Sequence, residues 1–373
     1  MNILFVIDYY GHPGGGTEGQ LLGLIRGLSG LGERPQLAVF RATEFTQDPA
    51  NRICPLTTLR IDRMLSFKTV ARMIGLARFL RRERIDLVHV FFNDAALVVP
   101  LFARLAGCKV VVSRRDLGLW YSPGKLRLLR FVNRFVDRIV ANSRAVADHV
   151  RRHEGGPPPP LLVIHNGYQR ARLALPAQAD LREKPGIGAE DPIIGMVANL
   201  RPVKRPADAV RAFAQAHRSH PSAHLIFLGE GPMQDELQAL ADSLGCGRSV
   251  HFLGSLKEVI PVVKQFRAGL LCSESEGFSN ALIEYMACGV PPVCTNVGGN
   301  AELVQDGVTG YLVDLGDIDA LARRMSSLIA DPELSQRIGS NARRSVERLS
   351  MDEMVASHLA VYRELLSNGR TPS

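Results

Sequence analysis

The feature that most constrains this chain is an alternation that occurs twice along it. Short, continuous apolar runs are followed by stretches with helical spacing of apolar residues. Continuous apolar runs are typical of parallel strands whose sheet is covered by helices on both faces. In the first half these runs lie at residues 2–8, 36–40, 86–92, 109–115, 139–143 and 161–167. The pattern predicts a buried parallel sheet.

The alternation lapses over residues 169–191 and then restarts. The chain therefore has the α/β class, with two tandem Rossmann-like, doubly wound domains. We expect an N-terminal domain over 1–178, a linker over 179–191 and a C-terminal domain over 192–350. The terminal helical stretch 351–373 is expected to pack back on the N-terminal domain. The second set of apolar runs lies at residues 193–200, 224–231, 250–255, 268–274, 291–299 and 310–314.

Length and composition agree with two cores. The chain has 373 residues, of which 46% are hydrophobic, enough for two sizeable domains. Open parallel sheets bind ligands beyond the carboxyl ends of their strands. Two such sheets that face each other would form an interdomain cleft, so we expect the function to lie there.

Charge is distributed unevenly. Residues 1–178 carry 26 Lys and Arg against 13 Asp and Glu, whereas residues 179–373 carry 19 against 24. A basic half can face anionic lipid, a phosphorylated acceptor or nucleic acid. We expect no nucleic-acid partner, since no known nucleic-acid module is recognisable and the aromatic content is only 6%. Two interpretations of the basic half remain: an ordinary face in contact with solvent, or a surface that binds an anionic membrane peripherally.

The six cysteines show no C-x-x-C spacing, and most lie in apolar surroundings. They predict buried, reduced thiols. The start of the chain lacks the basic segment and long apolar run of a signal peptide, and no apolar stretch approaches the length of a transmembrane helix. We expect a cytoplasmic protein, with the inner membrane face as a peripheral position.

A glycine-rich loop follows the first apolar run. Residues 14–19, GGGTEG, fit G-x-G-x-x-G, the outline of a dinucleotide-binding fingerprint. The first glycine, however, stands several residues beyond the strand, after Pro13, and Arg41 stands where an acidic residue would bind a ribose. Glu18 would also place a negative charge beside a pyrophosphate. The match to a nicotinamide fingerprint is therefore accidental.

The strongest motif lies in the second half. Glu276 follows an apolar run, and the turn Gly277, Phe278, Ser279 and Asn280 leads into a helix that carries Glu284. The N-terminus of a helix favours an anion, so a diphosphate fits there. Glu276 could accept hydrogen bonds from sugar hydroxyls, and Glu284 from a ribose.

The segment SESEGFSNALIEYMACGVPPVCTNVGGNAELVQDGVTGYLV, residues 273–313, closely resembles the donor-binding half of retaining glycosyltransferases of family 4, the glycosyl transferases group 1, which have the GT-B fold. The resemblance extends over nearly the whole chain. It implies transfer of a sugar from a nucleotide diphosphate sugar with retention at the anomeric carbon. It also implies that Glu276 faces the donor sugar and Glu284 the ribose.

Members of this family place an Arg and a Lys in the segment that corresponds to VANLRPVKRP. Here Asn199 stands at the usual Arg position. We interpret Arg201 and Lys204 as the diphosphate clamp, with Arg205 as a helper. Side-chain cations would stabilise the charge that develops on the leaving phosphate. We therefore expect no metal and no cofactor. Gly229 and Leu253 are the positions that the resemblance places beside the nucleotide.

The N-terminal half departs from the family. Many relatives have a His before an Asp after the fourth strand, whereas this chain has Arg115 and Asp116. Arg115, alone or with Arg114, could bind a phosphate or an anionic acceptor, and a structural salt bridge is the alternative. Gly15 and Gly16 are expected to bring backbone to the acceptor side.

The resemblance therefore implies a retaining hexosyltransferase that moves a sugar from a nucleotide donor to a glycan or lipid-linked acceptor, and we expect it to act in cell-surface polysaccharide or glycolipid synthesis. The residues point to no Asp or Glu nucleophile in the N-terminal half, so we adopt front-face substitution as the hypothesis. The alternatives are a nucleotide-sugar epimerase or a phosphorylase of the same fold, an NAD-dependent oxidoreductase and a non-catalytic nucleotide-sugar binder.

Overall fold

The computed structural model describes residues 1–11, 16–64, 66–91, 94–118, 121–154, 159–176, 181 and 186–367. Its contacts divide into two compact units, Met1–Gly167 with Met351–Ser373, and Tyr168–Ser350. The first unit thus ends at Gly167, before the expected boundary at 178. The reason is that the segment from Tyr168 packs into the core of the second unit, where Tyr168 and Leu181 are buried.

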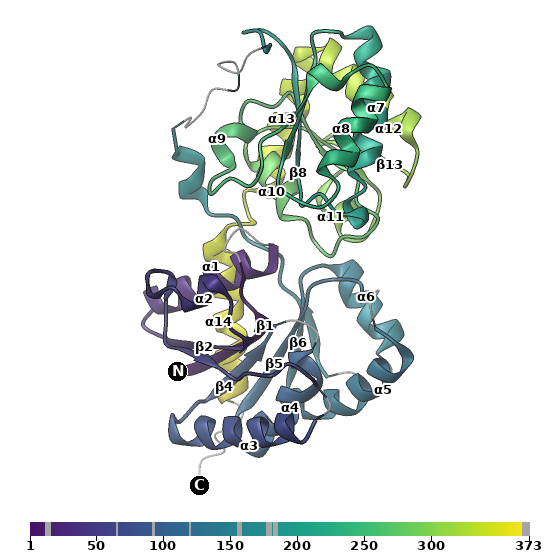
Figure 1. The fold of residues 1–373 in the computed structure, drawn as a ribbon. Coiled ribbons are helices and arrows are strands. Elements are labelled where there is room, and N and C mark those ends of the chain that lie inside the picture. The colour runs from purple at the N-terminus through teal and green to yellow at the C-terminus, as the bar shows by residue number, and fades with distance from the viewer. Residues whose placement is uncertain are drawn as a thin grey trace. The chain divides into compact units, whose positions relative to one another are not determined.

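The first unit is a seven-stranded sheet of order β3-β2-β1-β4-β5-β6-β7, in which every pair is parallel (Figure 1). Its strands are β1 (Asn2–Tyr9), β2 (Arg34–Arg41), β3 (Leu56–Thr58), β4 (Leu87–Val90), β5 (Lys109–Arg114), β6 (Arg138–Ala141) and β7 (Leu161–Val163). Its helices are α1 (Gly16–Gly30), α2 (Glu44–Gln47), α3 (Phe67–Arg82), α4 (Ala95–Leu105), α5 (Pro123–Val132), α6 (Arg144–His153) and α14 (Met351–Ser367).

Strand β1 explains why its apolar run is continuous. Ile3, Phe5 and Ile7 point to one face, into a core shared with α1 and α14. Leu4 and Val6 point to the other face, into a core shared with α3, α4, α5 and α6. Because side chains alternate along a strand, both faces of this sheet are buried, as the sequence predicts.

The terminal helix α14 belongs to the first unit and packs closely on α1. A Cβ atom on Gly23 would lie 2.4 Å from Met351 Sδ, and one on Gly27 would lie 2.5 Å from Val355 Cγ2. These two glycines, one helical turn apart, let the two backbones approach. At the other end of α14, Tyr362 Oη lies 2.6 Å from His89 Nδ1, and both side chains are buried in the core.

The second unit is a six-stranded sheet of order β10-β9-β8-β11-β12-β13, again with parallel pairs only. Its strands are β8 (Ile193–Val197), β9 (His224–Leu228), β10 (Val250–Phe252), β11 (Ala268–Leu271), β12 (Pro292–Thr295) and β13 (Tyr311–Val313). Its helices are α7 (Pro206–Ser219), α8 (Gln234–Ser243), α9 (Ile260–Val263), α10 (Asn280–Ala287), α11 (Asn300–Leu303), α12 (Ile318–Ala330) and α13 (Pro332–Val346). The prediction of two parallel α/β sheets is confirmed.

All six cysteines are free thiols, and four of them are buried. Burial raises the pKa of Cys54 and Cys272 to about 12. Within the described residues, no helix has both the length and the apolar character needed to cross a membrane.

Candidate functional site

A lysine and a glutamate meet at the carboxyl edge of the second sheet. Lys204 ends the 3-10 turn η5 (Pro202–Lys204), which follows β8, and Glu276 lies in the loop between β11 and α10. Lys204 Nζ donates to Glu276 Oε1 at 2.6 Å, and Ser273 Oγ donates to the same oxygen at 2.6 Å. Glu276 is only 9% exposed. The fold therefore joins two predicted catalytic residues in one largely buried ion pair.

The other predicted cation, Arg201, lies in the same turn. Its side chain is exposed, and the described residues show no ion pair for it. Arg205, the expected helper, instead donates from Nε to Asp208 Oδ2 at 2.5 Å, and this hydrogen bond raises the pKa of the guanidinium. The Glu274 N–H donates to the Val203 carbonyl at 2.9 Å, which fixes the η5 turn against the loop of Glu276.

The turn from Glu276 into α10 is built as the motif suggests. Ser279 is the N-cap of α10, and its Oγ accepts from the Leu282 N–H at 3.4 Å. Gly277 and Phe278 are buried, and Asn280 is the first residue of the helix. The N-terminus of α10, which favours a negative charge, thus directly follows the Lys204–Glu276 pair in the fold.

Glu284 is held by an arginine that the sequence did not single out. Arg172, in the 3-10 turn η3 (Arg170–Ala174), donates from Nη1 to Glu284 Oε1 at 2.9 Å. Its Nε and Nη2 donate to the two oxygens of Glu258, at 2.9 and 2.8 Å. Burial raises the pKa of Glu284, and the charge of Arg172 partly offsets this rise. Only the fold brings Arg172, Glu258 and Glu284 together.

Gly229, the first residue after β9, is in a backbone conformation that favours glycine. Its φ is +135°, and a Cβ atom would lie 2.1 Å from the Ala198 carbonyl oxygen. Its N–H donates to the Gly254 carbonyl at 2.8 Å, and the preceding Leu253 N–H bonds to Phe227. Gly229 and Leu253 thus belong to the backbone turns at the carboxyl ends of β9 and β10.

We expect Gly229→Ala to lower the free energy of unfolding of the second unit by about 2–4 kcal/mol, because strain and a backbone clash add. Denaturant unfolding measures this. Gly245→Ala is the matched control: its φ is +77°, and no atom lies within 4 Å of the added Cβ. The control should lose only about 1 kcal/mol. Equal losses in both variants would contradict a close approach at Gly229.

In the first unit, Arg115 follows β5 at the carboxyl edge of the sheet. Its Nη2 donates to Asn166 Oδ1 at 2.6 Å, and its guanidinium lies 5.7 Å from the centre of the Phe91 ring. Its Nε is buried and has no hydrogen-bond partner in the described part of the chain. Burial lowers the pKa of Arg115 to about 10, while the charge of Asp116 raises it. No ion pair of Arg115 is found there either, so the structural salt bridge is not supported.

Arg114 differs from its neighbour. Its Nε and Nη2 donate to the two carboxylate oxygens of the buried Glu154, at 2.6 and 3.0 Å. The expectation that Arg114 shares an anion site with Arg115 is therefore wrong, because Glu154 already neutralises its charge.

The remaining predicted residues of the first unit have mainly local contacts. Asp116 Oδ1 accepts from the Gly118 N–H at 2.7 Å, as in an Asx turn. Gly16 is the first residue of α1, while Gly15 lies outside the described residues.

Sequence reasoning missed Asp8 at the end of β1, whose carboxylate accepts from the Ala95 N–H at 2.7 Å. Burial raises the pKa of Asp8 to about 6.

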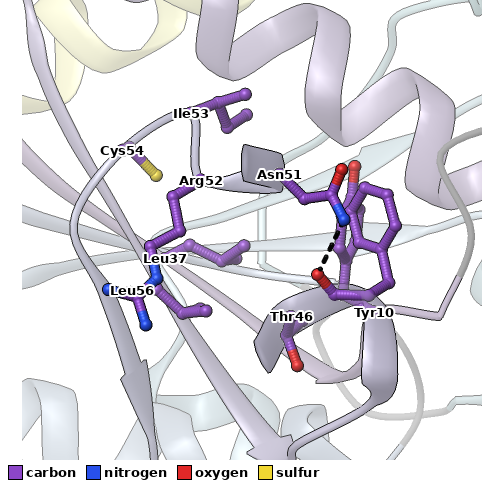
Figure 2. Close-up of a pocket in the computed structure, with 9 residues that line it drawn as sticks. Tyr10, Leu37, Thr46, Asn51, Arg52, Ile53, Cys54 and Leu56 are labelled. Carbon is purple, nitrogen blue, oxygen red and sulfur yellow. Dashed lines mark hydrogen bonds between the residues drawn. The ribbon is translucent and has the colours of Figure 1, made fainter. Parts of the chain in front are cut away.

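A small pocket lies in the first unit, beside β2 and β3. Figure 2 shows its lining, where Asn51 Nδ2 donates to the Phe45 carbonyl at 3.1 Å. None of the predicted site residues lines it. The lining residues are Tyr10, Leu37, Phe45, Thr46, Asn51, Arg52, Ile53, Cys54 and Leu56.

Comparisons with known proteins show which family the two halves of the chain resemble. Residues 14–172 match Glycosyltransferase Family 4, and residues 177–345 match Glycosyl transferases group 1. EpsD of Bacillus subtilis (strain 168), which is described as a glycosyltransferase, is 32% identical over 291 residues, covering 74% of this chain and 76% of EpsD. The chain belongs to glycosyltransferase family 4.

Other relatives of this family 4 enzyme agree. N-acetyl-alpha-D-glucosaminyl L-malate synthase of Bacillus anthracis is 29% identical over 303 residues, covering 79% of each chain. The crystal structure of Anabaena Alr3699/HepE in complex with UDP superposes with a TM-score of 0.85 at 24% identity, covering 97% of this chain and 100% of that one. The protein is thus a nucleotide-sugar glycosyltransferase of the retaining family with the GT-B fold. The alternatives of an epimerase or phosphorylase, an oxidoreductase and a non-catalytic binder are therefore set aside.

Proposed function

We propose that this family 4 glycosyltransferase binds the donor diphosphate with Arg201, Lys204 and the N-terminus of α10. Glu276 would accept hydrogen bonds from the donor sugar, and Glu284 from the ribose. The observation that carries the proposal is the Lys204–Glu276 pair directly before α10, since it combines a cation for phosphate with an acceptor for hydroxyls. Gly277, Phe278, Ser279 and Asn280 shape that turn, and Gly229 and Leu253 lie at the adjacent strand ends.

The proposed reaction is a front-face substitution. The bond between the anomeric carbon and the phosphate oxygen breaks, and the bond to the acceptor oxygen forms on the same face of the sugar. The proton of the acceptor hydroxyl passes to the leaving phosphate oxygen, so that no protein nucleophile is needed. Lys204 and Arg201 act by stabilising the negative charge that grows on the leaving group.

For the acceptor we propose an anionic or lipid-linked glycan, in cell-surface polysaccharide or glycolipid synthesis. Arg115 supports this, because it presents a cation without a carboxylate partner among the described residues at the carboxyl edge of the first sheet. Relatives named for L-malate and for D-inositol 3-phosphate act on anionic molecules. Another is named for phosphatidylinositol monomannoside, a lipid. Asp116, Gly15 and Gly16 would lie on this acceptor side.

The first test is a thermal-shift panel with UDP, GDP, ADP and NAD. A nucleoside diphosphate that binds the folded state raises the melting temperature. At a concentration one hundred times its dissociation constant, it raises the free energy of unfolding by about 2.7 kcal/mol. We expect a shift with one of the three diphosphates and none with NAD. The matching nucleotide sugars are then assayed for hydrolysis and for transfer to a lipid-linked phosphate acceptor and to a neutral glycan. Transfer to the neutral glycan alone would contradict the proposed acceptor class.

A further inference from the structure

Helix α3 of the first unit has a second apolar face that points into solvent. Met73, Leu76 and Leu80 are buried against the sheet, as expected for a covering helix. Phe67, Val70 and Ile74, however, are 96%, 50% and 42% exposed. Positions three and four residues apart share one side of a helix, so these three side chains form one continuous stripe. We call Phe67, Val70 and Ile74 the outer stripe.

Cations lie at the edge of the outer stripe and beyond its last residue. The residues from Ser66 to Arg82 include no Asp or Glu. Lys68, Arg72 and Arg78 are exposed, and the described residues show no ion pair or hydrogen bond for their side chains. Arg78 lies one further turn along the face of the outer stripe, and Lys68 lies at its edge beside Phe67, whereas Arg72, two residues from Val70 and from Ile74, lies on the other side of the helix. The helix therefore presents an apolar first half bordered and followed by positive charge.

The neighbouring helices α4 and α5 also carry exposed apolar side chains, and an Arg side chain lies close to one of them. α3 packs against α4, and α4 against α5 (Figure 1). Leu105 at the end of α4 is 59% exposed, and Phe131 on α5 is 47% exposed. The guanidinium of Arg134 lies 5.8 Å from the centre of the Phe131 ring. Exposed apolar side chains with neighbouring Arg side chains thus recur along this layer.

Among the partners that a basic surface can have, an anionic bilayer uses both features. Apolar side chains enter the boundary between headgroups and acyl chains, while Lys and Arg extend their charges to lipid phosphates. A nucleic-acid duplex would use the cations and leave the three apolar side chains in water. We infer that α3 lies on the surface of an anionic bilayer, with the outer stripe inserted and Lys68 and Arg78 over phosphates.

This inference rests on the proposed function and deepens it. Binding through α3 would bring the enzyme to the membrane that holds a lipid-linked acceptor. The charge is complementary, and the moderate apolar area predicts reversible binding at the bilayer surface rather than the irreversible anchoring of a membrane-spanning helix. Salt should weaken the binding, since exposed charges are screened over about 10 Å at 0.1 M ionic strength.

The test is co-sedimentation of the full chain with vesicles of phosphatidylcholine alone and of phosphatidylcholine mixed with phosphatidylglycerol. We expect the wild type to bind only the anionic vesicles. The variant F67S/I74S should bind them at least ~10-fold more weakly, and K68E/R78E should lose the preference for anionic lipid. The matched control is V308S/L315S, which removes two side chains of the second unit that are 40% and 45% exposed, and it should bind like the wild type.

Several outcomes would overturn the inference: equal binding to neutral vesicles, no binding by the wild type, or wild-type binding by both α3 variants. Size-exclusion chromatography adds another, since a dimer that F67S/I74S dissociates would assign the outer stripe to a second copy of the chain. Donor hydrolysis in solution keeps the two proposals apart. The α3 variants should retain it, whereas vesicle binding by a wild type that transfers no sugar to a lipid-linked acceptor would count against the proposed function alone.

Discussion

Lys204→Ala is expected to lower the rate constant of sugar transfer by about two to three orders of magnitude. A preorganised donor aimed at a developing negative charge contributes about 2.7–4 kcal/mol to transition-state stabilisation. Because that charge grows mainly in the transition state, kcat should fall more than the donor KM rises. Steady-state kinetics with the donor identified by the nucleotide panel measures both constants.

Lys204 also neutralises the buried Glu276, so the variant could lose activity by misfolding. Its melting temperature and its binding of the nucleoside diphosphate are therefore measured alongside. The double variant K204A/E276Q removes the charge that Lys204→Ala leaves without a cation, and it should regain stability without regaining transfer. Arg218→Ala, an exposed cation at the end of α7, is the control and should behave like the wild type. Full activity of Lys204→Ala would remove Lys204 from the proposed clamp.

The sequence predicted those parts of the site whose signal is local. The continuous apolar runs required sheets buried on both faces, and β1 has both faces buried. Glu276 and Lys204 each lie just beyond such a run, so the shared carboxyl edge of a parallel sheet brings them together. The helix that carries Glu284 could likewise be predicted from its Ser and Asn start.

Other contacts had no local signal. Arg114 and Arg115 are neighbours with the same side chain, but successive residues at a strand end point in opposite directions. Arg114 thus reaches the buried Glu154, forty residues along the chain, whereas Arg115 reaches Asn166. The domain boundary is a similar case. The apolar pattern lapses over 169–191, and within that lapse the sequence analysis placed the end of the first domain at 178. The packing of Tyr168 into the second core instead sets the boundary at Gly167.

Among the contacts that have no local sequence signal, the one between Arg172 and Glu284 matters most for the site. The two residues are 112 positions apart in the sequence. Burial raises the pKa of Glu284, and Arg172 is the cation that opposes this rise. Its hydrogen bond occupies Oε1, and among the described residues Oε2 has no hydrogen-bond donor. Under the proposed function Arg172 is thus a positioning residue. It keeps the carboxylate ionised and oriented so that Oε2 can accept from the ribose.

Arg172→Ala should therefore raise the donor KM by roughly 10-fold to 100-fold, the loss expected for a hydrogen bond to a charged group, with a much smaller change in kcat. The effect should grow as the pH falls, since Glu284 without its cation takes up a proton at a higher pH than in the wild type and then accepts more weakly. Arg172→Lys should recover part of the affinity. Kinetics across a pH series measures these changes, with isothermal titration of the nucleoside diphosphate.

The control is Arg170→Ala, in the same 3-10 turn, whose side chain donates to the Glu347 carbonyl instead. It tests whether disturbance of the turn is enough to weaken binding, and it should leave KM unchanged. A double-mutant cycle separates positioning from packing: if Arg172 acts through Glu284, then R172A/E284A should bind the nucleotide about as weakly as Glu284→Ala alone. Additive losses would show that Arg172 acts elsewhere, and an unchanged KM in Arg172→Ala would rule out its role at the ribose.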